Sequence, residues 1–329
     1  MDGRRLSLPM ARGAPPLTLR LTRLPPYDQS WVRSVTLINV GPKLYVEVTA
    51  EVPVASHELN AGPDPDQVAG VDLGIIHPFA LAGADRGLVV SGRAIRAENR
   101  LHLAEKKARA RAVARRAPKK GQAGSRRWRK YRARTRQLEE RHRRRVAQAT
   151  HEGARAVVDF AVAARIGTLV VGDPRGLLNA DSGKRQNLAV HNWPPGQAIA
   201  VLWDKAALAG IAVEVVDERG TSSTCPNCRA RVATPKGRRF FCAACGLVAH
   251  RDVVGAANIA SRGTRGGEPF DPSGLEIMHR RAGRHLPGRT RRDPRRVKMD
   301  HHRGSLGPWP AVARPEELGE SLDRDASAA

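Results

Sequence analysis

The chain has 329 residues, which is enough for one sizeable core and one or two small modules. Lys and Arg number 57 against 32 acids, a formal net charge of +25, so nucleic acid is the first-choice partner. No apolar run reaches transmembrane length, no signal peptide precedes the chain, and no basic amphipathic helix carries bulky aromatic anchors. These features favour a soluble, intracellular protein and argue against a membrane partner.

Residues 1–67 begin with a Pro- and Arg-rich lead. Strand-like runs follow at Trp31–Leu37 and Leu44–Val54, with a turn at Gly41-Pro42 between them. A small β-unit is therefore expected. Residues 62–66, GPDPD, are typical of a linker.

The stretch Val68–Leu81, VAGVDLGIIHPFAL, surrounds Asp72 with apolar residues. It predicts a buried strand that delivers one carboxylate to the open edge of a sheet. The alternative is a core strand whose Asp only caps a turn. Strands at Phe79–Ala82 and Gly87–Ser91 would complete an antiparallel meander.

A strongly basic segment, His102–Arg145, holds 19 Lys or Arg and three acids in 44 residues. Its composition favours helix, and Pro118 and Gly121–Gly124 break it into two arms, so we expect a basic helical hairpin over residues 94–166. A charged run is often only a solvated face, but this imbalance favours contact with phosphates. The candidate contact residues are Arg126, Arg127, Trp128, Arg129, Lys130 and Arg134.

Beyond the hairpin, a strand is expected at Thr168–Gly172, a helix at Gln197–Leu208, a strand at Ile211–Val216 and a last helix over residues 250–261. From residue 68 the order is three strands, helix, strand, helix, strand, an interruption and a helix. This order is typical of an α/β fold of the RNase H-like class, in which an antiparallel meander is followed by parallel strands.

All four cysteines lie within twenty-one residues, as the pairs Cys225/Cys228 and Cys242/Cys245. Two C-x-x-C knuckles separated by thirteen residues have the spacing of a tetrahedral structural Zn²⁺ ribbon. Free thiols or a redox pair are the alternative. Phe240 and Phe241 are expected to shield the metal.

An RNase H-like nuclease needs about three acids around two divalent ions, usually Mg²⁺. Asp72 and Asp252 are suitable, and Asp252 can also cap the last helix. The third acid is open because position 172 is Gly. Glu218, at the same end of the sheet, is our first choice; Asp173 is second, because side chains alternate along a strand, and Asp217 is third. In the alternative interpretation, Glu218 only pairs with a nearby base.

Six motifs, in order from Val68 to about Ala260, resemble the TnpB-like proteins, the OrfB-type transposases of bacterial insertion sequences that are relatives of the type V CRISPR effectors. They are GVDLGIIHPFA, the basic helical pair, VVGDPRG, DERGTSSTCPNC, FCAACG and HRDVVGAANIA. The resemblance implies an RNA-guided DNA endonuclease of a transposable element, bacterial, cytoplasmic and nucleoid-associated. Its partners would be DNA and a guide RNA held by backbone shape and charge.

The resemblance also implies a domain plan. Residues 1–67 would be part of a wedge-like β-domain, residues 68–219 and 250–261 a RuvC-like core, and residues 220–249 an inserted zinc ribbon. It assigns catalytic roles to Asp72 and Asp252 and zinc ligation to the four cysteines. Most members carry Glu where Gly172 stands, and a subset is thought to use a shifted Glu, which suits Glu218.

Residues 262–329 are Arg-, Gly- and Pro-rich and then acidic, so a disordered tail is expected. The recognition lobe that precedes the β-domain in the family is missing, so the chain is expected to be N-terminally truncated. Two other functions stay open: a nucleic-acid-binding protein of the same fold with weakened or lost cleavage, and a zinc-ribbon protein of the ribosome or transcription apparatus. The second does not explain Asp72 and Asp252.

Overall fold

A computed structural model of the chain describes residues 4–25, 27–40, 43–52, 62–177, 183, 187–188, 193–233, 237–264 and 271–286. The chain divides into two compact units, one that reaches Val52 and one within Pro53–Thr290. The tail beyond residue 286, the turn at Gly41-Pro42 and most of the polar loop over residues 178–192 lie outside the described residues.

The first unit is built from two antiparallel strand pairs. β1 (Arg5–Leu8) pairs with β2 (Leu17–Arg20), and β3 (Val32–Val40) pairs with β4 (Lys43–Ala50). The two strands predicted here are confirmed with small shifts in their ends. The first pair was not expected, because its strands are four residues long and lie among Pro, Arg and Gly.

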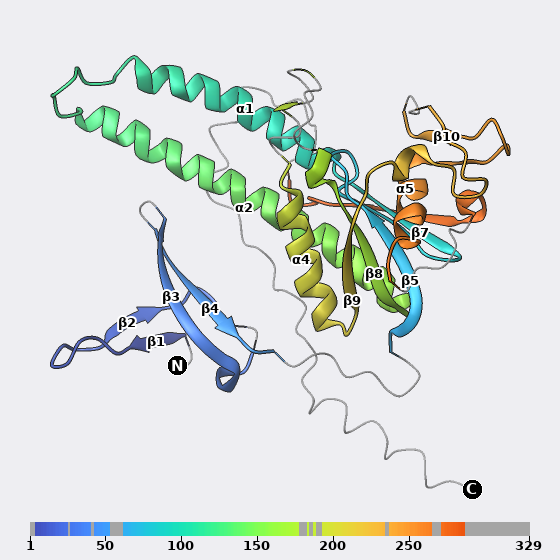
Figure 1. The fold of residues 1–329 in the computed structure, drawn as a ribbon. Helices are drawn as coiled ribbons and strands as arrows, with labels where there is room; N and C mark the ends of the chain where they lie inside the picture. The colour runs from blue at the N-terminus through green and yellow to red at the C-terminus, as the bar shows by residue number, and fades with distance from the viewer. Residues whose placement is uncertain are drawn as a thin grey trace, which may run out of the picture. The chain divides into compact units, whose positions relative to one another are not determined.

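The second unit is organised around a six-stranded mixed sheet of order β12-β7-β6-β5-β8-β9 (Figure 1). β5–β6 and β6–β7 are antiparallel, whereas β5–β8, β8–β9 and β7–β12 are parallel. The meander and the two parallel strands after it are as predicted. The strands are β5 (Asp64–Asp72), β6 (Phe79–Ala82), β7 (Arg86–Ser91), β8 (Ile166–Asp173), β9 (Ala212–Asp217) and β12 (Glu276–Arg281).

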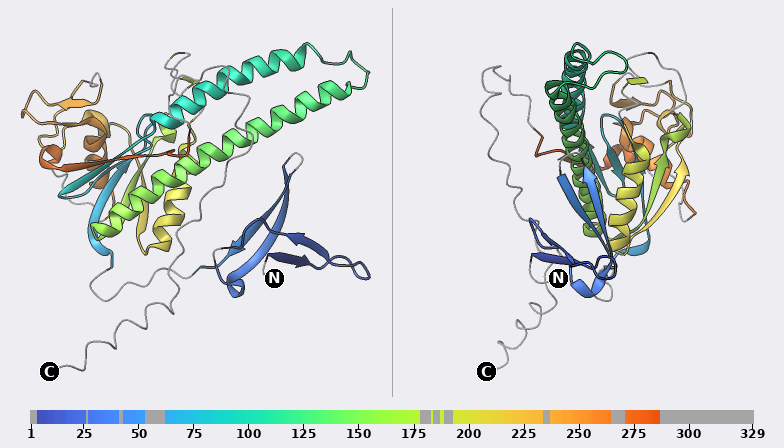
Figure 2. Two further views of the ribbon diagram at one scale, coloured as in Figure 1. Left: turned by 180° about the vertical axis from the view of Figure 1, so that it is seen from behind. Right: turned by 90° about the vertical axis from the view of Figure 1, so that its left-hand side faces the viewer.

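Helices cover both faces of this sheet (Figures 1 and 2). α2 (Arg126–Ala163) and α4 (Pro195–Leu208) pack on one face, where buried side chains such as Val71 and Leu169 point. α5 (Arg251–Ala260) packs on the other face, against alternate residues of β6 and β7. Since successive strand residues point to opposite faces, Asp72 lies on the α5 face.

The basic segment forms the predicted hairpin, in which α1 (Arg93–Ala114) runs beside α2 and both extend well past the sheet (Figures 1 and 2). Ser125 begins the second arm, because its side chain accepts a hydrogen bond from Trp128 N at 3.2 Å. Between the arms, the imidazole rings of His102 and His142 stack at 3.7 Å. The second arm ends at Ala163, three residues before the predicted end.

Two short strands, β10 (Arg239–Phe241) and β11 (Val248–His250), form an antiparallel pair inserted between β9 and α5. This insert carries the four cysteines. Phe240 is fully buried in a cluster with Cys225 and Cys242, as expected of a shielding residue. Phe241 is 52% exposed, so its predicted shielding role was wrong; successive residues of β10 point to opposite sides.

Two predicted boundaries were wrong. Asp64 already belongs to β5 and pairs with Ile166, so most of the expected linker is strand and the boundary at residue 67 falls inside it. Part of the expected disordered tail, residues 271–286, is ordered as β12 and its flanks. It is held because Leu286 is buried and the Glu152 carboxylate accepts hydrogen bonds from Gly283 N at 2.8 Å and Arg284 N at 3.1 Å.

Candidate metal centres and nucleic-acid surface

Asp72 is the last residue of β5, an inner strand of the sheet, and its side chain lies beneath the first turns of α5. The helix approaches closely because Gly70, two residues earlier on the same face, has no side chain: a Cβ there would overlap the Ala256 carbonyl oxygen and lie 2.6 Å from Ala260 N. Burial first, and then the charge of Asp252, raise the pKa of Asp72 to about 7. Asp72 is therefore an acid without a neutralising partner among the described residues.

Asp252 lies in the first turn of α5 and is 8% exposed. His77 Nδ1 donates to its Oδ2 at 2.6 Å, and Arg238 Nη1 lies 2.6 Å from Oδ1 and 3.0 Å from Oδ2. Burial raises the pKa of Asp252, but the His77 hydrogen bond and the Arg238 charge outweigh it and hold the pKa below its ordinary value. His77 lies inside the GVDLGIIHPFA motif and Arg238 lies between the two cysteine knuckles, but sequence reasoning assigned neither of them a contact with Asp252.

Glu218 follows β9 and is 9% exposed. It occupies the space above Gly172, where an added Cβ would lie 3.0 Å from both its Cβ and its Oε2. Oε2 is buried and has no hydrogen-bond partner among the described residues. Burial, followed by the charge of Asp72, raises the pKa of Glu218 to about 8. A side chain on position 172 and the Glu218 side chain would thus compete for one place.

Asp173 differs from Glu218 in both direction and pairing. It is one residue past Gly172 in β8, so its side chain points away from the α5 face. Arg175 lies 2.6 Å from its carboxylate, and this hydrogen bond is the first cause of a lowered pKa. The carboxylate is already neutralised by a partner on the chain.

The three acids Asp72, Glu218 and Asp252 thus come to one edge of the sheet from three separate elements. The unpartnered Oε2 of Glu218 and the raised pKa values of two carboxyls indicate negative charge that the described residues do not balance. Carboxylate oxygens are the donors that Mg²⁺ prefers, so the chemistry of the set suits a hard divalent cation, although the three carboxylates are not among the groups of described residues whose donor atoms all lie within 4.8 Å of one another.

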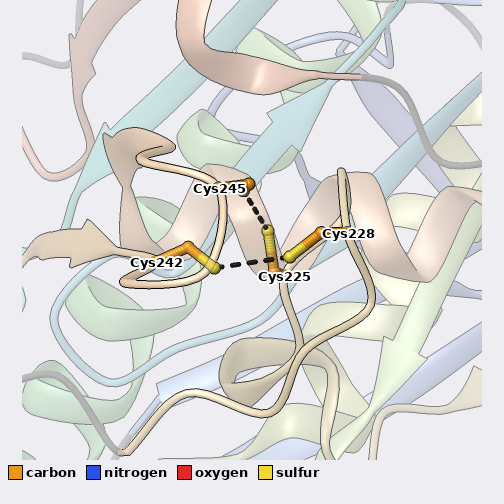
Figure 3. Close-up of side chains that lie close together, drawn as sticks. All are labelled: Cys225, Cys228, Cys242 and Cys245. Atoms are coloured by element: carbon orange, nitrogen blue, oxygen red, sulfur yellow. Dashed lines mark hydrogen bonds between the residues drawn. The ribbon is translucent and has the colours of Figure 1, made fainter.

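The four cysteine side chains converge on one point (Figure 3). The Sγ atoms of Cys225 and Cys245, and those of Cys228 and Cys242, are 3.5 Å apart, and all four lie within 4.8 Å of one another. Each knuckle is closed in the same way: Arg229 N donates to Cys225 O at 3.0 Å and Gly246 N to Cys242 O at 2.8 Å. Tetrahedral zinc with bonds of about 2.3 Å separates sulfurs by about 3.8 Å, so the cluster fits this ion.

The candidate phosphate-contact residues lie on the first turns of α2. Arg126, Arg127, Arg129, Lys130 and Arg134 are exposed, and within the described ranges none has an acidic partner. Trp128 and Tyr131 are half-buried, with the guanidinium groups of Arg132 and Arg116 stacked on them at 4.8 and 4.7 Å. The two rings therefore hold the guanidinium groups of Arg132 and Arg116 in place. The five exposed basic residues leave the surface with positive charge that no acid within the described ranges pairs.

Two family models match separate parts of the chain. A family of probable transposases, OrfB of the IS605 type, matches residues 45–178, and the Cas12f1-like TNB domain matches residues 196–259. No curated protein matches the chain. Among the described residues, none of the helices has the length and apolar character needed to cross a bilayer.

Three solved structures resemble the chain at low identity. A Cas12f1–sgRNA–target DNA complex is 20% identical with a TM-score of 0.46, covering 60% of this chain and 50% of that one. A CRISPR-Cas12f ternary complex is 18% identical (TM-score 0.46; 66% and 42% covered), and the mini-RNA-guided endonuclease Cas-phi3 is 17% identical (TM-score 0.33; 59% and 44%). The chain spans half or less of the length of each of these proteins. On the two family matches, the chain is a TnpB-like relative of the type V effectors.

Proposed function

We propose that the protein is an RNA-guided DNA endonuclease of the transposon-encoded TnpB/OrfB type, with an RNase H-like, RuvC-like core and a structural zinc ribbon. The observation that carries the proposal is the position of Glu218, whose unpartnered carboxylate stands over Gly172. It supplies an acid at the place where the neighbouring strand has none. The proposed endonuclease would cleave bacterial DNA in the cytoplasm.

The chain's own residues have distinct tasks in this proposal. Two divalent cations would be held by Asp72, Glu218 and Asp252. Because Gly70 has no side chain, α5 lies close enough to β5 for Asp72 and Asp252 to act together. The ions, when bound, activate a water and stabilise the leaving oxygen of a phosphodiester. Burial of Glu218 and Asp252 excludes bulk water and strengthens the electrostatic attraction for the cations.

Guide RNA and target DNA are the proposed partners. The exposed, unpaired cations at the start of α2 fit a phosphate backbone, which such a surface recognises by charge and shape. The Cas12f1 structure named above contains an sgRNA and a target DNA.

A second candidate function is a nucleic-acid-binding protein that has lost cleavage. Gly172 favours it, because the strand end that would supply an acid has no side chain, and Glu218 must then replace it from another element.

Cleavage of plasmid DNA by the full chain, with the RNA that co-purifies and Mg²⁺, tests the proposal. We expect Asp72→Asn and Glu218→Gln to lower the rate by about a hundredfold or more, and Asp173→Asn to leave it within a few-fold. If only Asp173→Asn loses activity, Glu218 is not the third acid. A wild-type protein that retains RNA and cleaves nothing supports the second candidate function.

A further inference from the structure

Two histidine side chains lie beside the Asp252 carboxylate at the start of α5. His77 comes from the loop between β5 and β6, and His250 is the last residue of β11. One donor atom from each of His77, His250 and Asp252 lies within 4.8 Å of the other two. His250 and Asp252 are two residues apart where β11 meets α5, and His77 joins them from a loop more than 170 positions earlier.

Ordinary hydrogen bonding accounts for only part of this cluster. His77 is bonded to the carboxylate at 2.6 Å, but His250 Nδ1 is buried and has no hydrogen-bond partner among the described residues. The two rings are 5.4 Å apart and tilted by 52°, so they are not stacked face to face. Leaving a buried nitrogen unpartnered is unfavourable, and a bound ligand would relieve this cost.

Arg238 contacts the same carboxylate from the ribbon side, with Nη1 2.6 Å from Oδ1 and 3.0 Å from Oδ2. Its side chain is 36% exposed, against 11% for Asp252, so the guanidinium can withdraw into solvent whereas the carboxylate cannot. A partly exposed positive group thus neutralises the carboxylate.

We propose that His77, His250 and Asp252 form a mixed nitrogen and oxygen site for a first-row transition-metal dication, and that Arg238 neutralises Asp252 when the metal is absent. Two imidazoles favour such an ion over Mg²⁺, which prefers an all-oxygen set. The inference rests on the proposed function in one respect: Asp252 then serves both this ion and the acid cluster, so one of the two nuclease ions is a transition metal.

Mn²⁺ is the probe, used with zinc-loaded full-length protein and observed by electron paramagnetic resonance. Thiolates bind Mn²⁺ poorly, so the cysteine cluster does not compete. We expect bound Mn²⁺ to show ¹⁴N electron spin-echo modulation from imidazole and to resist excess Mg²⁺. The spectrum of the wild-type protein alone tests the ligand set, whether or not every variant folds.

Variants separate the three contacts of the carboxylate. His77→Gln and His250→Gln should each weaken Mn²⁺ binding by about tenfold or more and reduce the ¹⁴N modulation. Arg238→Gln should tighten Mn²⁺ binding, because it removes a competing positive charge. His279→Gln is the matched control: His279 is exposed and its charge lowers the pKa of His250, yet it is not in the cluster, and we expect no change in modulation.

Bound Mn²⁺ without ¹⁴N modulation would overturn the site and leave an all-oxygen acid centre, with the proposed nuclease function intact. Absence of Mn²⁺ binding below millimolar concentration would also overturn it. Imidazole-ligated Mn²⁺ in a protein that cleaves no DNA would support the metal site and reject the nuclease function.

Discussion

The cysteine cluster and the acid cluster, the two proposed cation sites, are built in opposite ways. The four thiols come from positions 225 to 245, and each knuckle closes through its own backbone hydrogen bond. The three acids come from positions 72, 218 and 252, and they meet only after β5, β9 and α5 have packed. The first site is therefore a property of a short segment, and the second is a property of the whole sheet.

Their electrostatics differ in the same way. The cysteine set is closed, with four donors for one tetrahedral ion and no place for a further ligand. The acid set is open: Asp72 and Glu218 have pKa values raised to about 7 and 8, while Asp252 is partly neutralised by His77 and Arg238. In the proposed function, the closed set would stabilise the fold and the open set would keep its charge for a cation that contacts the substrate.

The largest expected effect is the loss of the ribbon in Cys242→Ser. Removing one thiolate leaves three donors, and structural zinc in such sites supplies about 10–16 kcal/mol of folding free energy. Because the cluster packs against Val254 of α5, we also expect the thermal unfolding temperature of the whole unit to fall. Zinc content by mass spectrometry and a thermal scan measure the two effects.

Asn227→Ser is the control, since Asn227 is exposed in the other knuckle, between Cys225 and Cys228, and is not a ligand. It should keep one zinc per chain and an unchanged unfolding temperature. Stoichiometric zinc in Cys242→Ser would mean that the site does not need all four thiols.

A smaller effect is expected from Gly70→Ala, which tests the dependence of the acid cluster on distant packing. The new Cβ would overlap the Ala256 carbonyl oxygen, and backbone of α5 cannot move aside as a side chain does. We expect a loss of about 3 kcal/mol in the free energy of unfolding, measured in urea, and weaker divalent-ion binding, with zinc retained.

Gly196→Ala is its control. Gly196 lies in α4 with no heavy atom within 4 Å of a Cβ, so alanine should be neutral or stabilise the helix by up to about 1 kcal/mol. Equal stability of Gly70→Ala and wild type would contradict the close α5–β5 contact.

The same contrast explains what could be predicted from the sequence. The cysteine knuckles, the meander and the basic hairpin have local spacing or periodicity, and all were found. The preference for Glu218 over Asp173 came from strand alternation, and the structure places Glu218 over Gly172 and Asp173 on the other face. Their catalytic roles are still predictions.

Contacts that form only in the folded protein leave no local pattern of spacing or periodicity in the sequence. β12, EIMHRR, has two apolar residues in six and pairs with β7 from nearly two hundred positions away, so its composition was taken for a disordered tail. Nothing local in the sequence shows that the Arg238 guanidinium meets Asp252. His77 could have been noticed, since it lies inside the GVDLGIIHPFA motif, five residues after Asp72.

The smallest expected effect concerns pH and the open acid set. Glu218 has a folded-state pKa of about 8, above its ordinary value of 4.5, so between these pH values the folded protein keeps a proton that the unfolded chain has released. The free energy of unfolding must then fall as pH rises from about 4.5 to 8 and stay low above that. Since a pKa difference of one corresponds to about 1.4 kcal/mol, we expect a total change of about 1–3 kcal/mol after relaxation.

Urea unfolding of zinc-loaded protein without other divalent ions measures this slope. Glu218→Gln should reduce the slope to the part that Asp72, with a pKa raised to about 7, contributes, and it should raise stability at pH 8. A saturating divalent cation should flatten the slope of the wild type, because it balances both charges. Asp173→Asn is the comparison: Arg175 lowers the pKa of Asp173, so its own contribution is lost only at acid pH, but its charge is a lesser cause of the raised pKa of Glu218, so the slope between pH 5 and 8 should fall less than in Glu218→Gln. Parallel profiles for wild type and Glu218→Gln would show that Glu218 is already neutralised, and the contrast between a closed and an open cation site would not hold.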